Sequence, residues 1–99
     1  MLLGGVTMPF YTPANETYQP IDLNRYKPIV VIAYYDIDGN IKPLRFKYES
    51  DFTFNINEIK YSKDVKGGIL FCCLITNCNK QQEVNLVYFI REHLWCLEI

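Results

Sequence analysis

Alanine, long apolar runs and an excess of either charge are missing or scarce in this chain of 99 residues. Alanine occurs only at Ala14 and Ala33, against eight Tyr and six Phe residues, and this balance disfavours helices and favours strands. No apolar run reaches the roughly 18 residues of a membrane-spanning helix, so we expect no membrane partner. The length allows one domain with a single modest core.

The charges nearly cancel, because ten Lys and Arg residues stand against eleven Asp and Glu residues and give a net charge of -1. A chain with this balance has no global positive field that would attract nucleic acid. Any nucleic-acid site must therefore be a local basic patch. The hydrophobic fraction of 49% is typical of a globular domain rather than a disordered chain.

Residues 1–27 differ from the rest of the chain. They contain three of the five prolines and no sustained periodicity, which predicts an irregular N-terminal arm before a domain at residues 28–99. The stretch MLLGGVTMPF is apolar but lacks the basic region and the length of an export signal, so we expect a cytoplasmic protein. The apolar side chains of this arm could lie against a neighbouring subunit and produce a homo-oligomer.

The clearest structural signal is a hairpin at the start of this domain. Two β-rich runs, 29–35 and 41–49, flank the sequence Asp-Ile-Asp-Gly-Asn at 36–40, and Asp-Gly between extended runs is typical of a hairpin turn. The acids also suggest a calcium loop, but the glycine stands at the fourth position, counting the first Asp as position one, and no Glu follows at the required distance. We therefore predict a turn. In the second run Leu, Phe and Tyr at 44, 46 and 48 alternate with charged residues.

The remaining segments also predict strands. The segment 52–62 alternates and then breaks phase at Ile59 and Tyr61, which indicates a bulge or bend. A loop at 63–68 and a polar turn at 77–82 are expected to separate further strands at 69–76, 83–90 and 94–99. Short strands at this spacing favour an all-β domain, a small five-stranded, partly open SH3-like barrel, with the irregular N-terminal arm outside it.

Two segments carry a resemblance to known proteins. YYDIDGNIKPLRFKYE places Pro-Leu-Arg-Phe after a glycine turn, and EVNLVYFI followed by LWCLEI forms an aromatic strand pair with a Trp at the end of the chain. Over residues 28–99 the chain resembles a group of small bacterial SH3-like β-barrel proteins. The resemblance implies a small barrel and no catalytic residues. Some relatives of this kind occur beside nucleic-acid enzymes, which favours a nucleic-acid role.

The four cysteines, Cys72, Cys73, Cys78 and Cys96, are expected to be reduced thiols in a cytoplasmic protein. Neighbouring strand residues point to opposite faces, so at least one of the adjacent pair belongs to the core. Together with His93 they could be metal ligands, but their spacing matches no common zinc module. A cysteine–histidine nucleophile would need a third, orienting group, and none is evident. We therefore expect no catalytic site, no cofactor and no enzyme activity.

The most suggestive feature is a basic strand face beside aromatic rings. Small barrels bind single-stranded nucleic acid with cations that follow the phosphates and rings that stack on bases. The candidate ligand-binding residues are Lys42, Arg45 and Lys47 together with the rings Tyr34, Tyr35 and Tyr61. A second basic stretch, Lys60, Lys63 and Lys66, is interrupted by Asp64. The alternative interpretation is an ordinary solvated face of a half-buried sheet.

Two functional hypotheses follow from these observations. The first is a non-catalytic binding module whose ligand is nucleic acid, or which is accessory to a nucleic-acid enzyme. The second is a protein–protein interaction or self-assembly module that uses the N-terminal arm. Oligonucleotide binding that depends on salt would favour the first, and a change of oligomeric state on truncation of residues 1–27 would favour the second.

Overall fold

The computed structural model describes residues 20–49 and 52–99, and these residues form β-strands and no helix. None of this part of the chain can therefore cross a membrane as a helix. The strands are β1 (Tyr26–Pro28), β2 (Val30–Tyr35), β3 (Ile41–Tyr48), β4 (Phe52–Asn55), β5 (Glu58–Val65), β6 (Gly68–Asn77), β7 (Lys80–Phe89) and β8 (Leu94–Glu98). They build a five-stranded sheet in the order β1-β8-β7-β6-β5 and a three-stranded sheet in the order β2-β3-β4.

The chain passes from one sheet to the other at two places. Between β1 and β2 lies only Ile29, whose N–H donates to the carbonyl oxygen of Trp95 at 3.0 Å. Between β4 and β5 lie Ile56 and Asn57, whose N–H groups donate to the carbonyl oxygens of Leu44 in β3 and Leu74 in β6, respectively. These hydrogen bonds tie the two sheets together at both crossings, because each links the crossing residue to a strand already in place.

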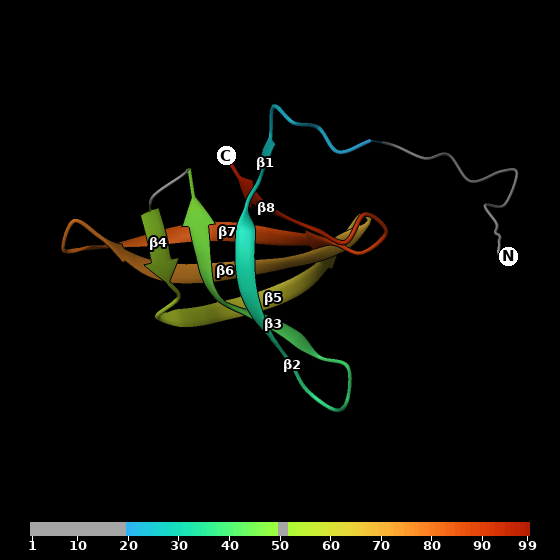
Figure 1. Cartoon of the computed structure of the whole chain (residues 1–99), viewed down its shortest axis with the longest axis horizontal. Coiled ribbons are helices and arrows are strands. Elements are labelled where there is room, and N and C mark those ends of the chain that lie inside the picture. Colours follow the sequence, from blue (N-terminus) through green and yellow to red (C-terminus); the bar gives the residue numbers. More distant parts are fainter. Residues whose placement is uncertain (1–19, 50–51) are drawn as a thin grey trace, which may run out of the picture.

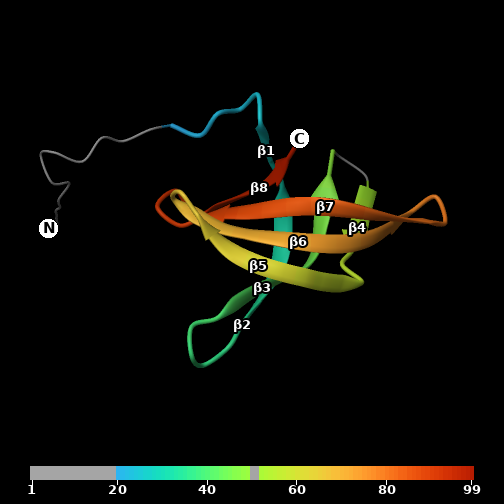
Figure 2. The same cartoon turned by 180° about the vertical axis from the view of Figure 1, so that it is seen from behind.

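The main core lies between the two sheets. The strands of the three-stranded sheet run across those of the five-stranded sheet, and the β2–β3 hairpin projects beyond it (Figure 1). Seen from behind, the five-stranded sheet covers the other sheet (Figure 2). Aromatic rings fill the space: the centroids of Phe71 and Trp95 are 5.6 Å apart, and those of Tyr88 and Trp95 are 5.1 Å apart. The buried members of this core are Phe46, Phe71, Cys73, Ile75, Leu86 and Trp95.

A second cluster covers the opposite face of the five-stranded sheet. Its buried members are Leu70, Cys72, Val87, Phe89 and Cys96. Tyr26 of β1 packs its ring edge-to-face against Phe89 with centroids 5.1 Å apart. The five-stranded sheet thus buries side chains on both of its faces, and Cys72 and Cys73, adjacent in sequence, belong to different clusters.

Tight turns connect most neighbouring strands. Gly39 adopts a φ of 84° in the β2–β3 turn, which glycine accepts without steric cost. Between β6 and β7, Cys78 and Asn79 have φ values of 54° and 63°, the two successive positive values of a two-residue hairpin turn. The predicted hairpin at 29–49 and the all-β class are confirmed.

Several predicted boundaries are wrong. The structure has eight strands where a five-stranded barrel was expected. β1 lies mostly in the predicted arm, and residues 56–57 divide the predicted run 52–62 into β4 and β5. Residues 63–65 of the predicted loop at 63–68 belong to β5, and residues 80–82 of the predicted turn at 77–82 belong to β7. Both connections are therefore shorter than their polar composition suggested. The phase break in 52–62 is confirmed by the interruption at 56–57 and by a bulge between Ile59 and Tyr61. The predicted domain boundary falls inside β1, and residues 1–19 of the predicted arm lie outside the described residues.

Candidate nucleic-acid interface

The outward face of the three-stranded sheet carries the predicted basic residues in one row. Lys42, Arg45 and Lys47, the basic row, are all exposed. In a regular strand Lys42 and Arg45 would point to opposite faces, because an odd number of positions separates them. A register shift between Ile32 and Ala33 places an extra residue in β3 and restores the common face.

A row of apolar side chains lies beside the basic row. Val30, Ile32 and Tyr34 of β2, the apolar row, pair with Lys47, Arg45 and Lys42, respectively. They are 67%, 49% and 50% exposed, which is high for large hydrophobic residues. Residues that pair directly share a face and lie about 5 Å apart, so the two rows run side by side. We call the surface formed by both rows the outer face.

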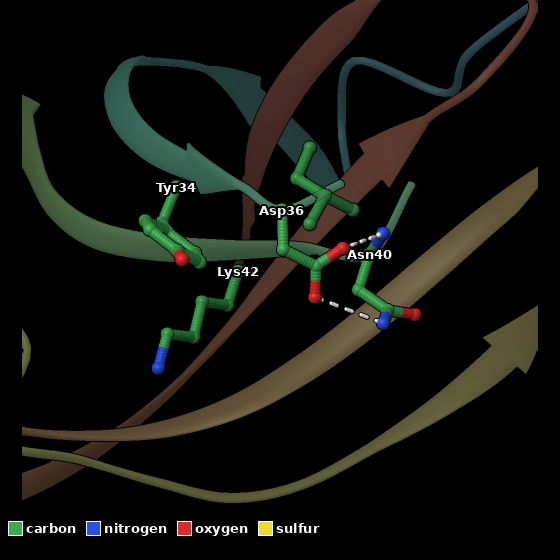
Figure 3. Close-up of a pocket in the computed structure, with 5 residues that line it drawn as sticks. Tyr34, Asp36, Asn40 and Lys42 are labelled. Atoms are coloured by element: carbon green, nitrogen blue, oxygen red, sulfur yellow. Dashed lines mark hydrogen bonds between the residues drawn. The ribbon is translucent and has the colours of Figure 1, made fainter. Parts of the chain in front are cut away.

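The hairpin end of the outer face is organised around Tyr34. The ammonium group of Lys42 lies 5.6 Å from the centroid of the Tyr34 ring, a cation–π contact. Figure 3 shows both side chains beside a shallow hollow of about 150 Å³, which Asp36, Asn40 and Ile41 also line. This contact holds a cation next to an exposed aromatic ring on the outer face.

The carboxylate of Asp36 belongs to the turn rather than to a cation site. Its Oδ1 accepts hydrogen bonds from the N–H groups of Asp38 and Asn40, each at 2.9 Å, and its Oδ2 accepts one from the side-chain amide of Asn40 at 3.0 Å (Figure 3). These donors, the Asn40 side chain above all, lower the pKa of Asp36. The hairpin interpretation of 36–40 is confirmed.

Among the described residues, no ion pair involves the basic row. The ion pairs within residues 20–49 and 52–99 join Arg25 to Glu98 at 3.6 Å and Lys60 to Glu83 at 2.7 Å, and neither reaches β3. The β4 residues opposite Arg45 and Lys47 are the uncharged Asn55 and Thr53. The outer face is therefore locally positive although the chain as a whole is slightly negative.

Two of the predicted rings do not join this surface. Tyr35 pairs with Ile41 and, as the residue after Tyr34, points to the opposite side of β2. Tyr61 lies in β5 opposite Cys72, on the face of the other sheet that turns away from β3. A hydrogen bond with the Cys72 thiol raises the pKa of Tyr61. Of the three candidate rings, only Tyr34 lies next to the basic row.

The second basic stretch is separate from the outer face. Lys60 pairs with Glu83, which raises the pKa of the lysine and lowers that of the glutamate. Lys63 stands opposite Leu70 in β6, on the second face of the five-stranded sheet. Lys66 follows in the turn between β5 and β6. These lysines therefore do not extend the basic row.

The cysteines show no arrangement for nucleophilic or metal chemistry. All four are free, and only Cys78 is exposed. Burial raises the pKa of Cys73 to about 12, which keeps it a thiol at neutral pH. The Nδ1 atom of His93 lies 3.1 Å from the hydroxyl of Tyr88. Across the described ranges, no three His, Cys, Asp or Glu side chains gather closely enough to hold a metal ion.

The apolar row is the part of this surface that the sequence did not predict. Continuous apolarity, as in 29–35, is typical of a strand that is covered on both faces, and no signal in the run itself distinguishes a covered face from an exposed one. No family model, curated protein or solved structure matches this chain. The resemblance to small bacterial SH3-like barrels therefore stays a prediction.

Proposed function

We propose that this protein binds single-stranded nucleic acid on the outer face of its three-stranded sheet. The observation that carries the proposal is the pairing of the basic row with the apolar row across β3 and β2. The cations of β3 would follow the phosphates, and Tyr34 would stack on a base. Val30 and Ile32 would contact the apolar faces of neighbouring bases or sugars.

The chemistry of the outer face favours binding without strong sequence preference. Base identity is read by hydrogen bonds to base edges, and the outer face presents mainly charged and apolar side chains. Stacking and phosphate contacts tolerate every base. With three cations in the basic row, we expect weak binding. A plot of the logarithm of the binding constant against the logarithm of the salt concentration should have a slope of about -2.

The proposal is tested by fluorescence anisotropy of a labelled oligothymidine over a salt titration. A triple variant, Lys42→Gln, Arg45→Gln and Lys47→Gln, is expected to abolish measurable binding. The control is Lys27→Gln, Lys63→Gln and Lys80→Gln, which removes the same charge from exposed positions of the other sheet. Wild-type protein that does not bind even at low salt would refute the proposal, and so would equal loss in both triple variants.

The role of the ring is tested separately. Replacing Tyr34 by Ala removes the stacking platform, and loss of one base stack costs about 1–3 kcal/mol, so affinity should fall by roughly tenfold. Tyr35→Ala is the matched control, because that ring points to the other side of the same strand. If both variants bind equally well, base stacking is not part of the interaction.

We also propose that the two sheets together form an SH3-like barrel in which two long strands are each interrupted where they pass from one sheet to the other. The support is that the runs β1–β2 and β4–β5 each contribute to both sheets, as strongly bent strands do in small barrels. The second hypothesis, self-assembly through the N-terminal arm, stays a prediction. Residues 1–19 of that arm lie outside the described residues.

A further inference from the structure

β2 presents an open edge. It pairs with β3 on one side, and no described strand pairs with it on the other (Figure 1). Its sequence VVIAYY contains no charge, proline or glycine. Exposed apolar edges of this kind are templates for pairing with another strand.

The direction of the free hydrogen-bonding groups follows from two bonds at the ends of β2. Asp36 donates its N–H to Asn40 across the hairpin, so even-numbered residues of β2 turn their backbone groups toward β3. Ile29 donates its N–H to Trp95 on the other side, so odd-numbered residues turn outward. The N–H and C=O groups of Val31, Ala33 and Tyr35 therefore point toward the open edge.

The other three strand edges among the described residues are short, charged or interrupted. β4, the far edge of the three-stranded sheet, has only four residues. β5, the edge of the five-stranded sheet, carries a bulge and the charged residues Lys60, Lys63 and Asp64. β1, the opposite edge, has three residues and ends with Pro28. Charges, bulges, short length and proline all discourage edge-to-edge pairing. β2 has none of these features.

We propose that a second copy of this chain pairs with β2 to form an antiparallel dimer about a two-fold axis at Ala33. In this register Ala33 faces Ala33 of the second copy, and Val31 faces Tyr35. Each such pair of outward-facing residues can exchange both backbone hydrogen bonds. The interface uses the same residues on both copies, as a two-fold dimer requires.

The register is set by the ends of the strand. An axis at Val31 would bring Ile29 into the pairing, but its N–H already donates to Trp95. An axis at Tyr35 would extend the pairing to Ile37 in the turn. Only the axis at Ala33 uses all three outward-facing residues.

The side chains are compatible with this pairing. On the outer face Ile32 would lie opposite Tyr34 of the second copy, apolar against apolar. The two basic rows would be separated by three strand spacings, about 14 Å, beyond the Debye length of about 8 Å at physiological ionic strength. The turn end of the β2–β3 hairpin projects past the five-stranded sheet, so the second copy can approach the edge from that end (Figure 2). The dimer would present one apolar band between two basic rows.

This inference does not depend on nucleic-acid binding, and its test is the molecular mass. Sedimentation equilibrium of the full chain from micromolar to millimolar concentrations should show a species of twice the 11.7 kDa chain mass. Tyr35→Pro removes one outward N–H donor and is expected to give a monomer, because proline is tolerated where an edge N–H faces solvent. Tyr35→Ala keeps the N–H and should stay dimeric.

Circular dichroism establishes that both Tyr35 variants are folded. A second proline variant, Ala33→Pro, lies at the centre of the pairing and is also expected to be monomeric. Hydrogen exchange should protect the amides of Val31, Ala33 and Tyr35 in the concentrated wild-type sample and release them on dilution. A wild-type chain that stays monomeric at millimolar concentration overturns the proposal, even if the edge accepts an unrelated peptide. So does a folded proline variant that is still dimeric.

Discussion

The two sheets of this protein differ in how many faces they bury. The five-stranded sheet packs Phe71 and Cys73 against the other sheet and covers Cys72 and Val87 within a second cluster on its opposite face. The three-stranded sheet buries only its inner face and leaves both rows of the outer face in solvent. Stability is therefore expected to depend mainly on the larger sheet, and binding on the smaller one.

The largest expected effect is in the core of the five-stranded sheet. Leu86 is 0% exposed and lies in the main core, so Leu86→Ala should lower the free energy of unfolding by about 2–5 kcal/mol. Ile32→Ala on the outer face should cost less than about 1 kcal/mol, because that side chain is half exposed. Urea unfolding of both variants measures the difference. Equal losses would contradict the division between the two sheets.

A second, smaller effect tests the close approach of β6 and β7. A Cβ atom at Gly68 would lie 2.3 Å from the carbonyl oxygen of Tyr88, so the two strands would have to separate. Gly68→Ala should therefore destabilise the fold by about 1–3 kcal/mol. Gln81→Ala, at an exposed position of β7, is the control and should be nearly neutral in the same urea titration. A neutral Gly68→Ala variant would show that the strands can separate without cost.

The smallest effect concerns the hairpin of the smaller sheet at acid pH. The folded state lowers the pKa of Asp36 below its usual value of 3.8, so its ionised form stabilises the turn above that pH. This stabilisation is lost as the pH falls through the lowered pKa. Wild-type protein should lose more stability than Asp36→Asn when urea midpoints are compared between pH 5 and below pH 3. Parallel losses in the two proteins would mean that the carboxylate contributes nothing to the turn.

Much of the fold could be predicted because alternation and turn chemistry are local. The alternation identified Phe46 and Tyr48 as inner-face residues of β3, and Asp-Gly identified its hairpin. The same alternation was wrong for Leu44, which is 45% exposed because it is the extra residue of the bulge, and Pro43 is buried in its place.

The division into two sheets could not be predicted, because it depends on where Ile29 and Asn57 find hydrogen-bond partners in distant strands. The turn at Cys78 and Asn79 was also placed too broadly, since neither residue is the glycine that positive φ usually indicates.

The candidate site was predicted in part. The common face of Arg45 and Lys47 follows from a period of two. Lys42 joins them only through the bulge in β3, which no feature of the sequence specified beyond Pro43. The choice of Tyr34 over Tyr35 and Tyr61 needed the pairing of β2 with β3 and of β5 with β6.

The sequence by itself determined that this chain forms strands, that a hairpin turns at Gly39 and that β3 has one apolar and one basic side. These properties follow from backbone preferences and from the two-residue repeat of side-chain direction, both of which act within a few residues. The tertiary structure decided that the apolar row is exposed, that the edge of β2 is open and that two of the three rings lie elsewhere. Exposure depends on what packs against a strand, and that is fixed by contacts between segments far apart in the chain.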